Sequence, residues 1–304
     1  MEYRRLGSLN VSVVGLGCNN FGWRTDAAGT AVVIDAALDA GINFFDTADV
    51  YGAGQSEEFM GRALKGRRDK VIIATKFGMK MGDGNEGARP EYIRQALDAS
   101  LRRLQVDTID LYQIHTPDAA TPIADTMQAL NDLVKAGKVR EIGCSNFSVE
   151  QMRSARAMPG PRYFASVQNH YSMFKRDPEA DVLPECERTG VAFLPYFPLA
   201  NGLLTGKYRK GQPFPHSSRG KDGFGPKIFT PENLERVEAL IAFAESRGHS
   251  LLELAFSWLA ARPEVSSIIA GAKTADQVHA NSVAAAWKLT PADLKEVDRL
   301  LSTV

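Results

Sequence analysis

The sequence has no excess of charge of either sign, because 36 Lys and Arg residues balance 36 Asp and Glu residues among its 304. It therefore lacks the broad basic face that favours binding to nucleic acids or anionic membranes. We also find no apolar run long enough to span a membrane and nothing at the N-terminus that resembles a signal peptide. These absences favour a small molecule as the partner, and predict neither a nucleic-acid nor a membrane partner.

Cysteine is scarce as well. Cys18, Cys144 and Cys186 are odd in number and have no CxxC spacing. A disulfide framework needs paired cysteines, and a thiol redox motif or zinc ribbon needs close pairs. We therefore predict a reduced, cytoplasmic protein.

What the sequence does contain is a repeated alternation of strand and helix patterns. Stretches such as Thr30–Ala40, Glu91–Leu104 and Ile123–Ala136 have the length and periodicity of amphipathic helices. They separate short apolar runs rich in β-branched residues, which predict eight strands: Val13–Gly17, Ile42–Asp46, Val71–Lys76, Asp110–His115, Val139–Cys144, Ser166–Gln168, Val191–Tyr196 and Ser266–Gly271. This order predicts the α/β class and a (β/α)8 TIM barrel, with residues 1–304 forming a single domain.

Three additions to the barrel are expected. Residues 3–13 predict two short strands around a turn, a β-hairpin that plugs one end of the barrel. The stretch Asn201–Pro226 is too polar and too interrupted to form an element, and we interpret it as a flap over the site. Near the C-terminus, three segments predict helices, one of which is additional to the eightfold pattern: Glu232–Arg247, Leu251–Ala261 and Pro291–Leu301.

Four polar residues fall at or just beyond the C-terminal ends of predicted strands, where a parallel barrel carries its chemistry. They are Asp46, Tyr51, Lys76 and His115. The Lys76 ammonium is expected to lower the pKa of Tyr51 from its usual ~10, and Asp46 to keep Lys76 charged. His115 would be a second donor to a carbonyl oxygen. The set predicts polarisation and protonation of a carbonyl group.

Each of these residues also has a purely structural interpretation. Lys76 and Asp46 could form only a buried ion pair, which by itself is weak evidence of function. His115 could simply be packed at a strand end, and Tyr51 could be an ordinary loop aromatic. The coincidence of four such residues on one rim favours the catalytic interpretation.

A carbonyl that is protonated must also receive electrons, so we expect the sequence to contain a binding site for a hydride donor. Residues 15–20 begin like a dinucleotide fingerprint, but Asn20 occupies the third glycine position. Gly271 and Lys273 precede a predicted helix at Thr274–Ala284, where a helix N-terminus and a lysine suit a phosphate group.

Other strand ends carry groups that recognise amides and a ring that can stack. Ser145, Asn146 and Gln168 are the amide-recognising groups, and Tyr196 is the ring. For Asn146 and Gln168, a role as simple strand-end caps is the alternative.

Four segments, in order and spacing, closely resemble the aldo-keto reductases over nearly the whole chain: Gly41–Gly52, Ala74–Gly78, Gly137–Phe147 and Gly202–Tyr208. The resemblance implies a (β/α)8 barrel that binds NADP(H) in extended form. It also implies reduction of aldehydes or ketones to alcohols, without metal or flavin. Asp46, Tyr51, Lys76 and His115 align with the catalytic tetrad of the family, with Tyr51 as the general acid.

The same resemblance implies a cofactor site along the rim, in which Ser145, Asn146 and Gln168 hold the carboxamide and Tyr196 stacks on the nicotinamide. Lys273 favours NADPH over NADH. The implied cofactor-binding residues are Gly17, Cys18, Asp46, Ser145, Asn146, Gln168, Tyr196, Phe197, Pro198, Leu199, Gly202, Lys207, Gly271, Lys273, Gln277 and Asn281.

Beside Tyr51 and His115, we predict Trp23 and Phe77 as apolar walls of the substrate pocket, with ordinary packing as the alternative. Two other functions remain open. One is an NADPH-binding regulatory subunit like those of potassium channels, in which the histidine position is typically asparagine, so His115 favours an enzyme. The other is a sugar or polyol dehydrogenase that works in the oxidising direction. The sequence predicts neither the substrate nor the oligomeric state.

Overall fold

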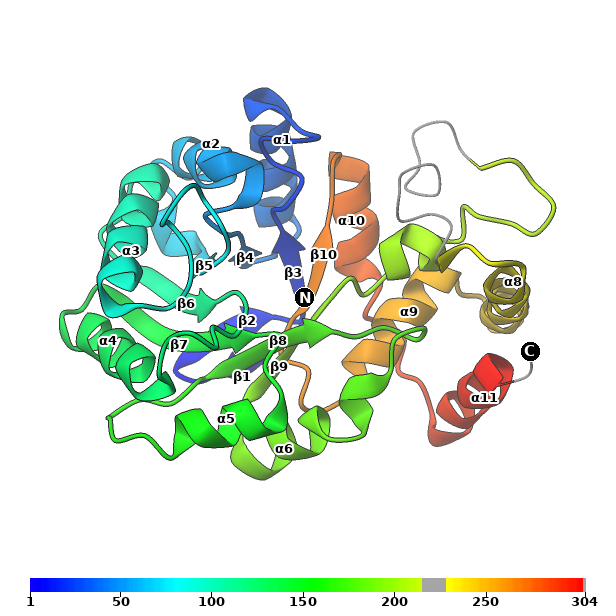
Figure 1. Cartoon of the computed structure of the whole chain (residues 1–304). Coiled ribbons are helices and arrows are strands. Elements are labelled where there is room, and N and C mark those ends of the chain that lie inside the picture. Colours follow the sequence, from blue (N-terminus) through cyan, green and yellow to red (C-terminus); the bar gives the residue numbers. More distant parts are fainter. Residues whose placement is uncertain (215–227, 303–304) are drawn as a thin grey trace.

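Eight parallel strands form a closed barrel in the computed structural model, which describes residues 1–214 and 228–302 (Figure 1). Their order around the barrel is β10-β3-β4-β5-β6-β7-β8-β9. The bounds are β3 (Val14–Gly17), β4 (Phe44–Asp46), β5 (Ile72–Phe77), β6 (Ile109–Ile114), β7 (Val139–Ser145), β8 (Ser166–His170), β9 (Ala192–Tyr196) and β10 (Ile268–Gly271). The predicted barrel is confirmed, and each predicted strand is present with its ends shifted by two residues or fewer.

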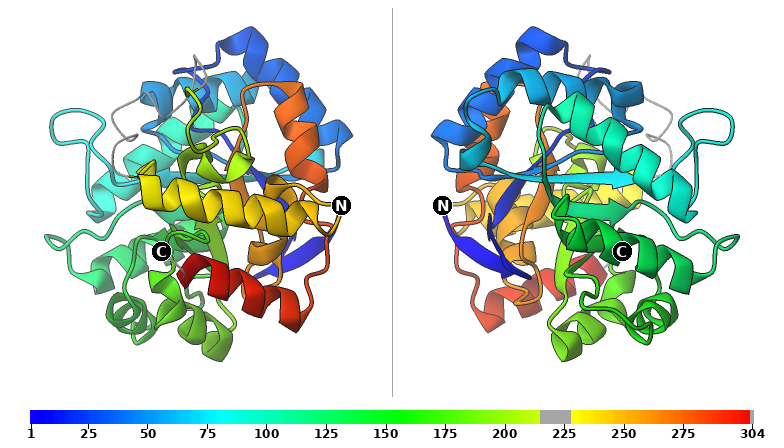
Figure 2. Two further views of the ribbon diagram at one scale, coloured as in Figure 1. Left: turned by 90° about the vertical axis from the view of Figure 1, so that its right-hand side faces the viewer. Right: turned by 90° about the vertical axis from the view of Figure 1, so that its left-hand side faces the viewer.

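Helices surround the strands (Figures 1 and 2). They are α1 (Ala27–Asp39), α2 (Gln55–Ala63), α3 (Pro90–Leu104), α4 (Ile123–Lys135), α5 (Val149–Arg156), α6 (Val182–Thr189), α8 (Pro231–Glu245), α9 (Leu251–Ala260), α10 (Ala275–Val283) and α11 (Pro291–Ser302). The helices α8 and α11 contact each other on one side of the molecule, as Figure 2 shows in yellow and red, and add to the barrel pattern. No helix within the described ranges is long and apolar enough to cross a membrane.

Local sequence explains where several of these helices start and end. Ser148 and Ser250 each form a capping box at the start of α5 and α9, in which the serine accepts a hydrogen bond from the third helical residue. Pro90 opens α3, where its fixed φ suits the first turn. Gly190 ends α6 in the left-handed conformation at φ 72°, which glycine adopts without a steric penalty.

The N-terminal hairpin consists of β1 (Tyr3–Leu6) and β2 (Leu9–Ser12), which pair in antiparallel fashion. Leu6, Leu9 and Val11 are buried in one apolar cluster with side chains from the barrel strands, including Phe44 and Leu111. The predicted plug is therefore confirmed. It closes the end of the barrel opposite to the C-terminal strand ends.

A second apolar cluster lies between the strands and the surrounding helices, and it contains most of the remaining core side chains. The predicted flap begins differently from our expectation, because residues 200–205 form a short 3-10 helix, η4 (Ala200–Thr205). Three residues within it, Ala200, Asn201 and Gly202, have positive φ and bend the chain. The rest of the flap includes residues 215–227, which lie outside the described residues.

Candidate active site

The four residues predicted to be catalytic lie together because they follow neighbouring parallel strands. Asp46 is the last residue of β4, Lys76 lies in β5, and His115 directly follows β6. Tyr51 begins a short 3-10 turn, η1 (Tyr51–Gly54), after β4. Since the carboxyl ends of parallel strands meet at one edge, residues far apart in sequence converge there.

Lys76 and Asp46 form a buried ion pair. The Lys76 Nζ lies 2.6 Å from Asp46 Oδ2 and donates a second hydrogen bond to the Thr47 carbonyl at 2.9 Å. Burial alone lowers the pKa of Lys76, but the charges of Asp46 and Tyr51 outweigh burial and the pKa is raised. Lys76 is therefore an ammonium near neutral pH, as the sequence predicted.

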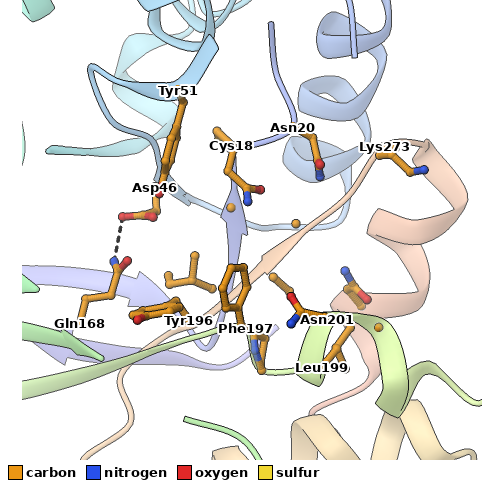
Figure 3. Close-up of a pocket in the computed structure, with 18 of the residues that line it drawn as sticks. Cys18, Asn20, Asp46, Tyr51, Gln168, Tyr196, Phe197, Leu199, Asn201 and Lys273 are labelled. Carbon is orange, nitrogen blue, oxygen red and sulfur yellow. Dashed lines mark hydrogen bonds between the residues drawn. The ribbon is translucent and has the colours of Figure 1, made fainter. Parts of the chain in front are cut away.

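The second oxygen of Asp46 is held by two amides. Gln113 Nε2 donates to Asp46 Oδ1 at 3.2 Å. Gln168 Nε2 donates to the same oxygen at 2.9 Å (Figure 3). Gln113, which was not among the predicted site residues, is buried near the C-terminal end of β6. The sequence feature that could have identified Gln113 is a polar residue at an inward-facing position of a predicted strand.

Tyr51 lies above this pair, with the Lys76 Nζ 5.2 Å from the centre of its ring. The ammonium lowers the pKa of Tyr51, but burial of the hydroxyl raises it by more, so the pKa is raised overall. The expected net lowering is therefore wrong, because sequence reasoning counted the charge and not the loss of solvent. Tyr51 keeps its proton near neutral pH, as a general acid must.

His115 faces Tyr51 edge to face, with 5.8 Å between the ring centres and 82° between the planes. Burial, and then the charge of Lys76, lower the pKa of His115 to about 3. Its imidazole is therefore neutral at physiological pH and can donate one hydrogen bond without carrying a positive charge. Within the described ranges, its buried Nδ1 has no hydrogen-bond partner.

Asn146 ties together the ends of four strands. Its backbone lies in the left-handed region at φ 61°, and its Nδ2 donates to the His115 carbonyl at 3.0 Å. Its Oδ1 accepts a hydrogen bond from the Tyr196 hydroxyl at 2.8 Å. Its N–H donates to Asn169 Oδ1 at 2.7 Å, so Asn169 helps to hold this conformation although the sequence did not point to it.

A cavity of about 570 Å³ extends from the tetrad along the rim, and every residue predicted to bind the cofactor lines it. Tyr51, Asp46 and Gln168 lie at one end and Lys273 at the other (Figure 3). Lys76 does not line the cavity, because it is completely buried behind Tyr51 and Asp46.

The two predicted walls of the substrate pocket do not line this cavity. Phe77 is completely buried and stacks on Tyr112, with 4.7 Å between the ring centres. Side chains alternate along a strand, so Phe77 points to the helix layer when Lys76 points inward. Trp23 is 63% exposed and lines a shallow second pocket. Met79 and Thr116 line the main cavity beside the tetrad instead.

The cavity is rich in positive charge. Arg24, Lys207 and Lys273 line it, and among the described residues its lining contains one carboxylate, Asp46, which is paired with Lys76. Arg24, which lies in the loop after β3, was not among the predicted site residues. Three cations around a single compensated carboxylate suit a ligand with several phosphate charges.

The end of the cavity near α10 is shaped for close approach of such a ligand. The Lys273 N–H donates to Gln277 Oε1 at 2.8 Å, and Thr274 caps α10 through the N–H of Gln277. A Cβ on Gly271 would lie 3.1 Å from Asn20 Nδ2 and 3.2 Å from Asn19 Oδ1, within the cavity lining. The donors, the helix N-terminus and the missing side chain together fit an extended dinucleotide phosphate.

The protein is thus an eight-stranded barrel with a Tyr–Lys–Asp–His cluster at its C-terminal end and a cationic cavity along its rim. Residues 13–302 match the sequence model of the aldo/keto reductase family, and the chain belongs to that family.

Relatives of known name are similar over nearly the whole chain. The aldo-keto reductase YhdN of Bacillus subtilis is 38% identical over 99% of this chain and 94% of its own. A probable voltage-gated potassium channel subunit beta of rice, Oryza sativa, is 34% identical over 92% of this chain and 90% of its own.

A solved structure extends the likeness to the fold. The glycerol dehydrogenase of Gluconobacter oxydans superposes with a TM-score of 0.87 at 36% identity, covering 99% of this chain and 95% of that one.

Proposed function

We propose that this protein reduces an aldehyde or a ketone to an alcohol, using NADPH as the hydride donor and Tyr51 as the general acid. The observation that carries the proposal is a single cavity with a buried proton-donating cluster at one end and phosphate-binding chemistry at the other. Membership of the aldo/keto reductase family supports the same reaction class.

The residues at the catalytic end have separate roles in this proposal. When bound, NADPH supplies a hydride to the carbonyl carbon. Tyr51 donates its proton to the carbonyl oxygen, and the Lys76 ammonium stabilises the phenolate that remains. Neutral His115 donates a hydrogen bond to the same oxygen and orients the carbonyl group. Asp46 holds Lys76 charged, and Gln113 and Gln168 hold Asp46.

The residues along the rim would hold the cofactor. Asn146 and Ser145 offer amide and hydroxyl groups for the carboxamide, and Tyr196 offers a ring for the nicotinamide. In the structure the Asn146 side chain is bonded to His115 and Tyr196, and Gln168 is bonded to Asp46. These bonds already fix the orientation of the groups, so binding would cost little additional side-chain ordering.

The test is the loss of NADPH absorbance with a panel of small aldehydes, ketones and sugars, measured for the wild type and for Tyr51→Phe. We expect turnover by the wild type, a loss of about 10²–10⁴-fold in the variant, and little change in NADPH affinity. Loss of turnover together with loss of NADPH affinity would assign Tyr51 a structural role. Tight NADPH binding with no turnover on any substrate would favour a regulatory function, as the potassium-channel name of one relative suggests.

Oxidation of a polyol is the second candidate, because one solved structure similar to this chain is a glycerol dehydrogenase. The same site would run in reverse, with Tyr51 accepting the proton of the hydroxyl group. Measuring NADP⁺ reduction with glycerol and other polyols beside the reduction panel decides between the two directions.

A further inference from the structure

Asp49 is a buried carboxyl group that the proposed chemistry does not use. It lies two residues before Tyr51, its side chain is 2% exposed, and it does not line the cavity. In the part of the chain that the structure describes, no side chain donates a hydrogen bond to either of its oxygens. A buried carboxylate without such donors is costly, so Asp49 requires an explanation.

A second buried carboxyl group faces Asp49 from α2. Glu57 is completely buried, and both of its oxygens have partners, Thr75 Oγ1 at 2.5 Å and Arg103 Nε at 2.7 Å. Arg103 also contacts the turn after Tyr51, because a Cβ on Gly54 would lie 2.9 Å from its Cδ. Arg103 is therefore paired with Glu57, and its charge only partly offsets the burial of Asp49.

The other groups around Asp49 offer it little compensation. Lys76 on β5 is paired with Asp46, and Tyr92 on α3 and Tyr112 on β6 are phenols whose pKa values burial raises further. Burial, and then the charge of Glu57, raise the pKa of Asp49 to about 7, while the Val50 N–H, Arg103 and Lys76 offset part of this rise. The surroundings therefore favour the protonated form of Asp49.

The turn that carries Tyr51 depends on this region. Gly52, Ala53 and Gly54 have φ values of 58°, 54° and 95°, so three successive residues lie in the left-handed region. For Ala53 that conformation carries a steric cost, which persists only where the surrounding packing supports it. Asp49 precedes this turn and Glu57 follows it, so repulsion between their charges would act on both of its ends.

We propose that Asp49 is a positioning residue that holds the Tyr51 turn in its catalytic conformation only while its carboxyl group is protonated. The ionised carboxylate is repelled by Glu57 and, among the residues that the structure describes, has no unpaired cation beside it, so it favours conformations in which the turn opens toward water. The carboxyl group binds its proton more tightly in the closed turn than in the open turn. Opening therefore becomes more favourable as pH rises, by up to about tenfold per pH unit between the ordinary aspartate pKa of ~4 and pH 7, and it changes little above pH 7.

Hydrogen exchange of residues 47–57 tests the proposal without any substrate. Exchange is measured from pH 4 to pH 8, corrected for the intrinsic rate, in the wild type and in Asp49→Asn, whose amide imitates the neutral acid. We expect similar protection at about pH 4, exchange in the wild type that becomes faster by up to about tenfold per pH unit toward pH 7, and a constant difference above pH 7. Asp107→Asn removes an exposed carboxylate and is the control, which should follow the wild type. Parallel exchange in the wild type and Asp49→Asn across this range would overturn the proposal.

Glu57→Gln gives an independent test if Asp49→Asn does not fold. It keeps a hydrogen-bond acceptor for Thr75 and removes the charge that raises the pKa of Asp49 in the closed turn, so the rise in exchange rate should level off at a lower pH than in the wild type. A rise that levels off at the same pH as in the wild type would contradict the pairing of the two carboxyl groups.

The catalytic consequence rests on the proposed function. In the wild type, kcat for carbonyl reduction should fall as pH rises toward 7, and in Asp49→Asn this fall should disappear while KM for NADPH stays the same. A fall at much higher pH, from Tyr51 itself, should remain in both. Absence of turnover at every pH, with the exchange difference intact, would contradict the proposed function alone. Turnover with identical pH profiles in both proteins would contradict the role of Asp49.

Discussion

The two ends of the barrel are built from the same strands but bury opposite kinds of side chain. At the N-terminal end, Leu6, Leu9 and Val11 of the hairpin fill the interior with apolar contacts. At the C-terminal end, the buried Asp46 accepts hydrogen bonds from three buried side chains, those of Lys76, Gln113 and Gln168.

The difference shows how one barrel separates stability from chemistry. Apolar contacts are non-directional, so the plug needs suitable volumes and little else. At the polar end, each buried polar atom needs a hydrogen-bond partner at the right distance and angle. Removing one side chain leaves the polar atom that it contacted without a partner. Substitutions at the two ends should therefore have different signatures.

Lys76→Met should produce the largest effect, because it removes the cation of the buried ion pair at the polar end. Asp46 would remain buried with two amide donors and no cation, which should lower the free energy of unfolding by about 3–5 kcal/mol. Denaturant unfolding monitored by circular dichroism measures this change. Adding Asp46→Asn should restore most of the stability, because a neutral pair needs no counter-charge, without restoring turnover. A single variant as stable as the wild type would contradict the importance of the ion pair.

Leu9→Ala tests the apolar end, where we expect a loss of stability without a loss of activity. Leu9 is 1% exposed, and its truncation should cost about 2–5 kcal/mol of unfolding free energy through lost contacts and a cavity. We expect kcat per folded molecule to stay unchanged, since the plug is at the far end of the barrel. Val32→Ala, at a position that is 55% exposed, is the control and should change stability little. A large loss of kcat in Leu9→Ala would show that the two ends are coupled.

Lys273→Met should have the smallest effect. It tests the end of the cavity far from Tyr51, which we expect to bind the phosphate groups of the cofactor. If Lys273 binds the 2′-phosphate, NADPH should bind more weakly by about 1.5–3 kcal/mol, roughly 10–100-fold, while NADH binding is unaffected. Titration of both cofactors by fluorescence measures the difference. Lys207→Met is the matched comparison. The family resemblance implies that Lys207 lines the pyrophosphate, which both cofactors share, so this variant should weaken the binding of both. Equal weakening of NADPH and NADH by Lys273→Met would exclude a role in cofactor choice.

Features that depend on local patterns were predicted correctly. The eight strands follow from apolar runs between helical periods, and the hairpin from turn residues between apolar ones. The alternation predicts a helix after each strand, but no bounds were predicted for α2, α5 and α6, each of which has only eight or nine residues. Short helices of this kind form because the barrel packs against them rather than through their own propensity.

The errors at the site arose where the answer depends on neighbours distant in sequence. Phe77 was expected in the substrate pocket, but its place in the strand alternation turns it toward Tyr112. The pKa of Tyr51 was expected to fall, but burial outweighs the charge of Lys76. Neither the direction of a side chain in a barrel nor its loss of solvent can be obtained from spacing alone.

By itself, the sequence determined the barrel, the residues at its strand ends and the family. These depend on local periodicity and on residue types at predictable positions. Only the tertiary structure decided that Lys76 lies behind the cavity, that His115 is neutral, and that the charge of Glu57 acts on the buried Asp49. The physical reason is that pKa values and pair energies depend on distance and burial, which arise only when separate elements pack together.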